Sequence, residues 1–337
     1  MSDPLRGAVL WLLRHRGRSS LPFYCDPARV GTFAVAPEQL AEGSEAALFR
    51  LFISLSMYQA LRDVVIMRQQ RSLSIRAVRI VADLGALGRG IERHPCSILS
   101  SFEAFEEGCD VWKGGGTTDC RRSPGLACHV KEGTRAFNRM GDMGKLPTSA
   151  WLRFWRGAGL KPLLEEICRA DPSPTRRASL LVEQFAAVHR VGRKLATLFV
   201  SALSTPPLAP RLTPWFPRID GNELVVIDTN VAQAVDALRP PGAPRTYDAR
   251  AQWVREQAAK INLSKLRSDL PPYSPRLVQE ALYAFCSKSN RVASEDVCAS
   301  RRTPCAACIP KLCPFMASSQ VRQRARAVIQ ARLEGLG

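Results

Sequence analysis

The most chemically distinctive stretch of the sequence is a run of four cysteines near the C-terminus. The run contains Cys298, Cys305, Cys308 and Cys313, with gaps of six, two and four residues between successive cysteines. Four sulfurs this close in the sequence can reach one metal centre without help from the rest of the chain. Soft thiolate ligands select zinc or an iron–sulfur cluster. The spacing alone leaves both open, along with the alternative of four unrelated thiols.

A lysine follows a short glycine-containing turn between two predicted helices, 176–188 and 193–204. The turn reads His-Arg-Val-Gly at residues 189–192, and Lys194 lies in the first turn of the second helix. Backbone N–H groups at such a helix start, together with the helix dipole, suit a phosphate oxygen. Gly192 permits close approach of a ligand to the backbone. The alternative is an ordinary bundle turn followed by a solvated lysine.

An aspartate stands at the start of another predicted helix. A short apolar run, 224–227, leads directly into Asp228, and the helix then continues to about residue 238. Aspartate at this position is a good N-cap. Because a carboxylate can cap a helix and also face a cleft, the structural and chemical roles of Asp228 are compatible.

Helical periodicity dominates the elements that must position these residues. The segment 45–68 predicts one long, buried central helix, since apolar residues occur nearly all round it and Ser44 can cap it. Strand signals are nearly absent, so we expect an all-α fold. Further helices are predicted at the following places: 73–86, 150–170, 247–261, 274–287 and 319–334.

The segment 94–148 departs from this pattern and predicts an irregular insertion with one or two short helices. It contains three consecutive glycines at 114–116 and five potential metal ligands, which are Cys96, Cys109, Cys120, Cys128 and His129. Their spacings fit no compact ligand pattern. The sequence therefore favours free thiols here over a second metal site.

The composition indicates a polyanionic partner. The 337 residues include 48 Lys plus Arg against 30 Asp plus Glu, a net charge of +18. Nucleic acid is the simplest polyanion for such a surface, and a generic basic surface is the alternative. The apolar run 7–13 is too short to span a membrane. Eleven cysteines without a secretory signal favour reduced thiols, so we expect an intracellular protein, in the cytoplasm or nucleoid if bacterial.

Four segments, taken in order, resemble motifs of the endonuclease III family of helix-hairpin-helix DNA glycosylases. Residues 52–63 resemble the family's LLSAQATD helix, and residues 188–196 resemble its hairpin, LPGVGRKTA. Residues 226–231 resemble its VDTHV segment, and residues 298–313 resemble its C-terminal [4Fe-4S] loop. The resemblance covers roughly 44–90 and 150–315.

The resemblance implies a two-lobed all-α fold that binds double-stranded DNA as a monomer. A six-helix barrel lobe would span 44–204 and include the insertion 94–148. The cluster lobe would combine 1–43 with 205–320, and a basic C-terminal helix would occupy 321–337. The resemblance favours a [4Fe-4S] cluster over zinc as the cofactor of the cysteine run.

The chemistry implied is that of a DNA glycosylase with lyase activity at abasic sites, acting on a damaged base such as an oxidised pyrimidine. Lys194 would be the nucleophile and Asp228 would stabilise the developing charge on the sugar. The DNA-binding residues implied are Gln59, Arg190, Val191, Gly192, Arg193, Arg301 and Arg302. Two alternatives stay open: another modified base, such as a modified cytosine or oxidised purine, or a non-catalytic DNA-binding protein of the same fold.

The hairpin departs from the family pattern at its start. Val188, His189 and Arg190 replace the usual Leu-Pro-Gly. Loss of the glycine should strain or reshape the turn. Arg190 would either add a direct phosphate contact or leave the site weakened. Asn230 replaces the usual histidine after Asp-Thr, and the last cysteine gap is one residue shorter than usual.

Overall fold

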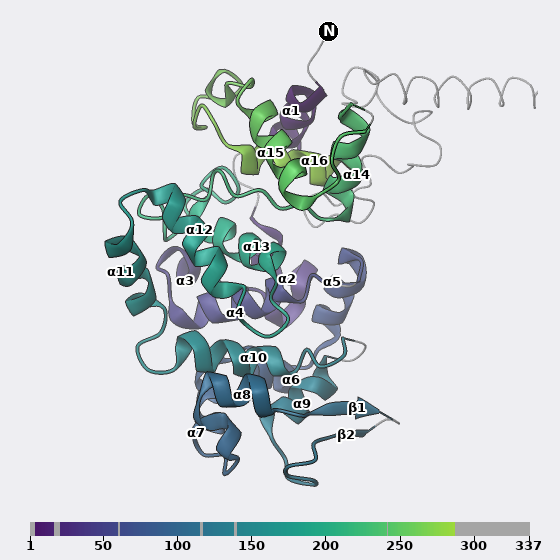
Figure 1. Cartoon of the computed structure of the whole chain (residues 1–337), viewed down its shortest axis with the longest axis vertical. Coiled ribbons are helices and arrows are strands. Elements are labelled where there is room, and N and C mark those ends of the chain that lie inside the picture. Colours follow the sequence, from purple (N-terminus) through teal and green to yellow (C-terminus); the bar gives the residue numbers. More distant parts are fainter. Residues whose placement is uncertain are drawn as a thin grey trace, which may run out of the picture. The chain divides into compact units, whose positions relative to one another are not determined.

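The computed structural model describes residues 4–16, 21–59, 61–114, 117–137, 140–240 and 242–286. The cysteine run, Arg301, Arg302 and the predicted C-terminal helix all lie outside these residues. Helices make up 61% of the described residues and strands 2%, which confirms the predicted all-α class (Figure 1).

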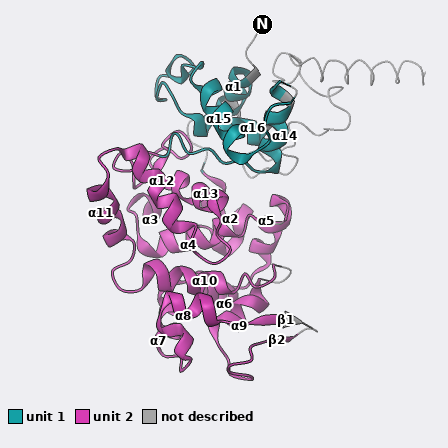
Figure 2. Ribbon diagram, viewed as in Figure 1, with its two compact units in different colours: residues 1–21, 221–337 teal, residues 22–220 magenta. Residues whose placement is uncertain are grey.

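The chain divides into two compact units (Figure 2). The smaller one combines residues 1–21 with 221–337, and the larger one is 22–220. The N-terminal and C-terminal parts of the chain thus share one unit. Residues 22–43 and 205–220 belong to the larger unit.

The smaller unit is built around α16. Helix α1 packs along α16, which also contacts α14 and α15. Leu12 of α1 and Leu282 of α16 are fully buried in this core. The described elements of the unit are α1 (Pro4–Arg16), α14 (Thr229–Leu238), α15 (Tyr247–Ala258), η5 (Leu263–Lys265) and α16 (Pro275–Cys286).

The larger unit is built around α4, whose residues 47–49 and 51–56 are all buried. Its first elements are η1 (Phe23–Cys25), α2 (Pro27–Val30), η2 (Gly31–Phe33), α3 (Pro37–Ala41), α4 (Glu45–Ser56), α5 (Asp63–Ser72), α6 (Ile75–Ala82), α7 (Leu84–Glu92), η3 (Ser97–Ser100) and α8 (Phe102–Gly108). The rest are β1 (Trp112–Gly114), β2 (Thr117–Asp119), α9 (His129–Ala136), α10 (Lys145–Ala150), η4 (Trp151–Trp155), α11 (Lys161–Ala170), α12 (Pro174–Phe185) and α13 (Arg193–Ser204).

The prediction of one helix over 45–68 is wrong, because α4 ends at Ser56 and α5 begins at Asp63. Side-chain amides bind carbonyl groups at the end of α4. Gln70 Nε2 donates to the Ser54 carbonyl at 3.0 Å, and Gln59 Nε2 donates to the Ser56 carbonyl at 2.6 Å. Carbonyls at a helix C-terminus need such partners. The polar residues that interrupt the apolar pattern therefore terminate the helix.

A cluster of aromatic rings joins α4 to the helical hairpin. Phe52 on α4 meets Phe199 on α13 with ring centroids 4.9 Å apart, and Phe185 at the end of α12 lies 4.9 Å from Phe199. Trp155 and Trp215 pack on the same rings. Because aromatic pairs add geometric specificity to burial, this cluster fixes α12 and α13 against the central helix.

The insertion contains more regular structure than the sequence predicted. The two short helices α8 and α9 agree with the expectation, but the antiparallel pair β1–β2 was not predicted. Trp112 pairs with Asp119 and Gly114 with Thr117. Each strand is only three residues long, which is too short for alternating hydrophobicity to be recognised.

Candidate functional site

The predicted hairpin is present, and its second helix has the predicted bounds, 193–204. Helices α12 and α13 pack against each other, and residues 186–192 join them (Figure 1). The Val191 N–H donates to the Val188 carbonyl at 2.8 Å within the turn. Arg190 adopts φ 58°, in the left-handed region that favours glycine. This conformation strains a non-glycine residue, as the sequence analysis expected for the turn.

Two acidic side chains of the insertion bind the strained turn. Arg190 Nη1 donates to Asp142 Oδ1 at 2.5 Å. The His189 ring places Nε2 at 3.0 Å from Asp142 Oδ2 and Nδ1 at 3.4 Å from Glu106 Oε2. The His189 N–H also donates to Ser149 Oγ at 2.9 Å. The four contacts form a clasp, and they hold the turn in place from outside the hairpin.

The clasp keeps its carboxylates ionised. Burial raises the pKa of Asp142, but the hydrogen bond from Arg190 and the charge of His189 outweigh it, so the net pKa is lowered. Partial removal from water likewise raises the pKa of Glu106, and hydrogen bonds from His189 and Ser149 reverse the effect. A phosphate that approached Arg190 would therefore compete with an ionised Asp142 for the guanidinium.

The start of α13 is open to a ligand. Gly192 is the N-cap residue of this helix, and no side chain caps it. Both Gly192 and Arg193 are exposed, and a Cβ placed on Gly192 would meet no atom within 4 Å. An exposed helix N-terminus with a small cap residue can receive an anion. The start of α13 is thus exposed and not capped by a side chain, and phosphate binding there stays a prediction.

Lys194 is held at the break that follows α4. Its Nζ donates to the Tyr58 carbonyl at 3.1 Å, and its side chain is half-buried. Tyr58 is 2% exposed, and its hydroxyl donates to Gln70 Oε1 at 3.3 Å. The carbonyl that binds the lysine is therefore itself anchored. These contacts exclude the alternative of a plainly solvated lysine.

Gln59 lies beside this contact, in the same break. It is half-buried, and its Nε2 lies 3.3 Å from Met143 Sδ as well as on the Ser56 carbonyl. Because Tyr58 and Gln59 are neighbours, the structure brings Gln59 and Lys194 to one place. The sequence placed Gln59 on a helix, and the structure places it in a turn.

Asp228 performs the predicted capping role. Its Oδ1 accepts from the Val231 N–H at 2.7 Å, at the start of α14. The apolar run before it is buried without forming a strand, because the Tyr247 hydroxyl donates to the Val225 carbonyl at 2.8 Å and Gln279 accepts from Val226. Asp228 belongs to the smaller unit and Lys194 to the larger one.

The residues that hold the site together could not be predicted from the sequence. Tyr58 acts through its backbone carbonyl, and no residue type signals such a role. Asp142 and Glu106 lie in the insertion, where no periodicity relates them to the hairpin. The available signal was that both residues are acidic in a strongly basic chain. No sequence spacing, however, relates them to the turn.

No family model, no curated protein and no solved structure matches the chain. In the described residues, no helix combines the length and the apolar character needed to cross a membrane.

Proposed function

We propose that this chain is a DNA glycosylase with lyase activity at abasic sites, and that it removes a damaged base, most simply an oxidised pyrimidine, from duplex DNA. The observation that carries the proposal is the position of Lys194. Its amine lies in the first turn of a helix whose N-terminal residues are exposed and uncapped by any side chain, beside a turn that would receive a phosphate. A nucleophile and a site for the DNA backbone thus share one hairpin.

The hairpin would bind the sugar–phosphate backbone near the target nucleotide. Exposed N–H groups at the start of α13 would donate to phosphate oxygens, and Arg193 would add positive charge. The net charge of +18 supports a nucleic-acid partner. The target base would leave the stack so that the amine can reach its sugar. Gln59, next to the carbonyl that binds Lys194, would fill the gap left in the duplex.

The reaction would require Lys194 to lose a proton and leave the Tyr58 carbonyl. The neutral amine would attack the sugar C1′, and the bond from C1′ to the base nitrogen would break as the base takes up a proton. Opening of the C1′–O4′ bond would give a Schiff base. Loss of a C2′ proton would then expel the 3′ phosphate and cut the strand.

Asp228 would stabilise positive charge on the sugar and assist proton transfer. Capping uses Oδ1, and a carboxylate has further acceptor capacity. The C-terminal cysteines, Cys298, Cys305, Cys308 and Cys313, would hold a [4Fe-4S] cluster that fixes their loop and supplies no step of the reaction. Arg301 and Arg302 would contact phosphates from that loop.

One observation favours a second candidate, a non-catalytic DNA-binding protein. The hydrogen bond from Lys194 to the Tyr58 carbonyl ties α13 to the end of α4, and a protein without catalysis would also use this link. The two candidates predict the same binding and differ in covalent chemistry.

Borohydride trapping separates the candidates. The full chain is incubated with a duplex that carries an abasic site, or with duplexes that carry oxidised pyrimidines, and borohydride then reduces any Schiff base. We expect a covalent adduct from the wild type and none from Lys194→Ala. Lys161→Ala is the matched control, because Lys161 is another lysine in the first turn of a helix, and it should keep the adduct.

Tight binding to every duplex without any adduct would overturn the enzymatic proposal and favour the binding protein. Circular dichroism of the Lys194→Ala variant checks that loss of the adduct is not loss of the fold.

A further inference from the structure

Four cysteines of the insertion meet at one cavity. Two of them lie at the start of the insertion: Cys96 comes just before η3, and Cys109 comes just after α8. The other two lie further on: Cys120 comes just after β2, and Cys128 comes just before α9. They line a cavity of about 30 Å³ together with His94. All four are free thiols. Their wide spacing in the sequence hid this convergence, and the fold of 94–131 produces it.

Backbone N–H groups point at two of these sulfurs. Cys128 Sγ accepts from the Lys131 N–H at 3.4 Å and also from the Val130 N–H. The Val111 N–H donates to the Cys109 sulfur. In each case the donor lies two or three residues after the cysteine. Hydrogen bonds of this kind are part of the surroundings of metal-bound thiolates.

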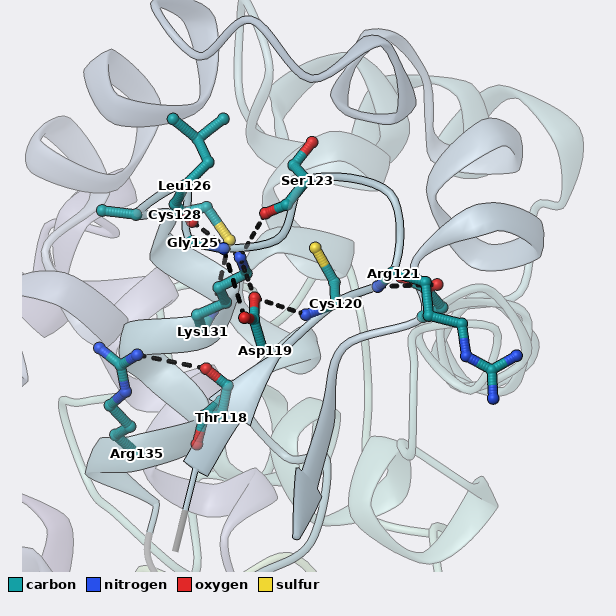
Figure 3. Close-up of polar contacts among 12 residues, drawn as sticks. Thr118, Asp119, Cys120, Arg121, Ser123, Gly125, Leu126, Cys128, Lys131 and Arg135 are labelled. Carbon is teal, nitrogen blue, oxygen red and sulfur yellow. Dashed lines mark hydrogen bonds and ion pairs between the residues drawn. The ribbon is translucent and has the colours of Figure 1, made fainter.

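A buried cation stands in the wall of the same region. Lys131 is 2% exposed, and its Nζ lies 2.5 Å from Asp119 Oδ1 and 2.7 Å from the Ser123 carbonyl. The ammonium also hydrogen-bonds Cys120. Figure 3 shows the sulfurs of Cys120 and Cys128 beside this network of polar contacts.

We propose that Cys96, Cys109, Cys120 and Cys128 bind a single zinc ion that fastens the insertion. Four thiols would each release a proton and bind Zn²⁺ as thiolates in a tetrahedral site, with Zn–S distances of about 2.3 Å. Among the described residues, no three His, Cys, Asp or Glu side chains are placed so that they could hold a metal ion, so binding would require the cysteine side chains to rotate and bring their sulfurs together.

His94 is not one of the proposed ligands, because both of its ring nitrogens already have partners. Nδ1 accepts from the Cys96 N–H at 3.1 Å, and Nε2 lies 3.0 Å from the Ala127 carbonyl. The ring instead joins the segment of Cys96 to that of Cys128. Such a partner orients the ligand-bearing backbone.

The site would be structural and does not rest on the proposed function. The elements that it would join are short: α8 has seven residues, and each strand has three. Segments of this size bury little apolar surface by themselves, and metal binding supplies folding free energy. Glu106 of the clasp lies on α8, so the metal would also steady one support of the hairpin turn.

Metal analysis of single cysteine variants tests the proposal. The full chain is purified without chelators, and zinc and iron per chain are measured by mass spectrometry. We expect about one zinc per chain in the wild type, and its loss in Cys109→Ser and Cys128→Ser. Cys168→Ser is the matched control, because Cys168 lies on α11 and does not line the cavity. Cys305→Ser should leave the zinc in place.

A measurement on the wild type covers the case in which serine variants fail to fold. Metal-stripped protein is titrated with Co²⁺, which should produce thiolate-to-cobalt charge-transfer absorption. Zinc should also protect the four thiols from alkylation, as mapped on peptides, and leave Cys168 unprotected. Equal alkylation with and without zinc, zinc lost only in Cys305→Ser, or a native disulfide between two of the four would each overturn the proposal.

Discussion

The helical hairpin is held by aromatic rings, whereas the insertion that touches it is held by an ion pair and hydrogen bonds. Phe185 and Phe199 of the hairpin are fully buried against Phe52. In the insertion, the buried Lys131 instead gathers a carboxylate and two carbonyl groups. Both regions belong to the same unit, so the difference reflects their sequences and not their surroundings.

Two kinds of interaction, aromatic packing and ion pairing, act on the turn between α12 and α13. Aromatic packing positions the hairpin helices, but it does not specify the conformation of the turn between them. The acids Asp142 and Glu106 complete that specification from the insertion. The strained residue of the turn, Arg190, is therefore held by a partner elsewhere in the chain.

The largest expected effect comes from removing a hairpin ring. Phe199→Ala empties a site that is 0% exposed, and we expect a loss of about 3–5 kcal/mol in the free energy of unfolding. Ile75→Ala is the control, because Ile75 is 77% exposed and should change stability by about 0.5 kcal/mol or less. Urea denaturation followed by tryptophan fluorescence measures both. Similar losses in the two variants would contradict the central role of the aromatic cluster.

A smaller effect isolates the strain in the turn. Arg190→Ala removes the ion pair with Asp142 but keeps a side chain at φ 58°, whereas Arg190→Gly removes both the pair and the strain. We expect the Gly variant to be more stable than the Ala variant by about 1 kcal/mol, since a left-handed conformation costs a non-glycine residue about 1–2 kcal/mol. Loss of the exposed pair alone should cost about 0.2–1 kcal/mol.

The same denaturation measurement, repeated at high salt, sharpens the result. Salt should weaken the wild-type ion pair and leave the difference between the two variants unchanged. Equal stability of the Gly and Ala variants would show that the turn is not strained.

The contrast between the regions also explains what could be predicted from the sequence. The helix predicted at roughly 193–204 is present, because apolar residues at helical spacing identify a buried helix directly. The end of α4 was missed, since it depends on a side-chain amide from another segment. Gln70 of α5 donates this hydrogen bond to the Ser54 carbonyl of α4. The cavity cysteines were found as residues but not as a group, because their convergence depends on a fold without periodicity.

The smallest expected effect is a change in how the free energy of unfolding depends on pH in acid. The hydrogen bond from Lys131 and the N–H of Cys120 lower the pKa of Asp119 from 3.8 to about 2. The unfolded chain therefore takes up this proton more readily than the folded one, so the contribution to stability is complete above pH 3.8 and is lost as the pH falls to about 2. The isosteric variant Asp119→Asn has no such titration.

Urea midpoints of metal-stripped wild type and Asp119→Asn, measured in steps from neutral pH to about pH 2, test this expectation. Removing the metal is necessary, because protons would also compete with zinc for the proposed thiolate site. The wild type should be more stable at neutral pH, since Asp119→Asn leaves the buried Lys131 without its carboxylate. The two profiles should converge in acid. If they stay parallel, the Asp119–Lys131 ion pair does not hold the insertion, and the contrast with the hairpin loses its physical basis.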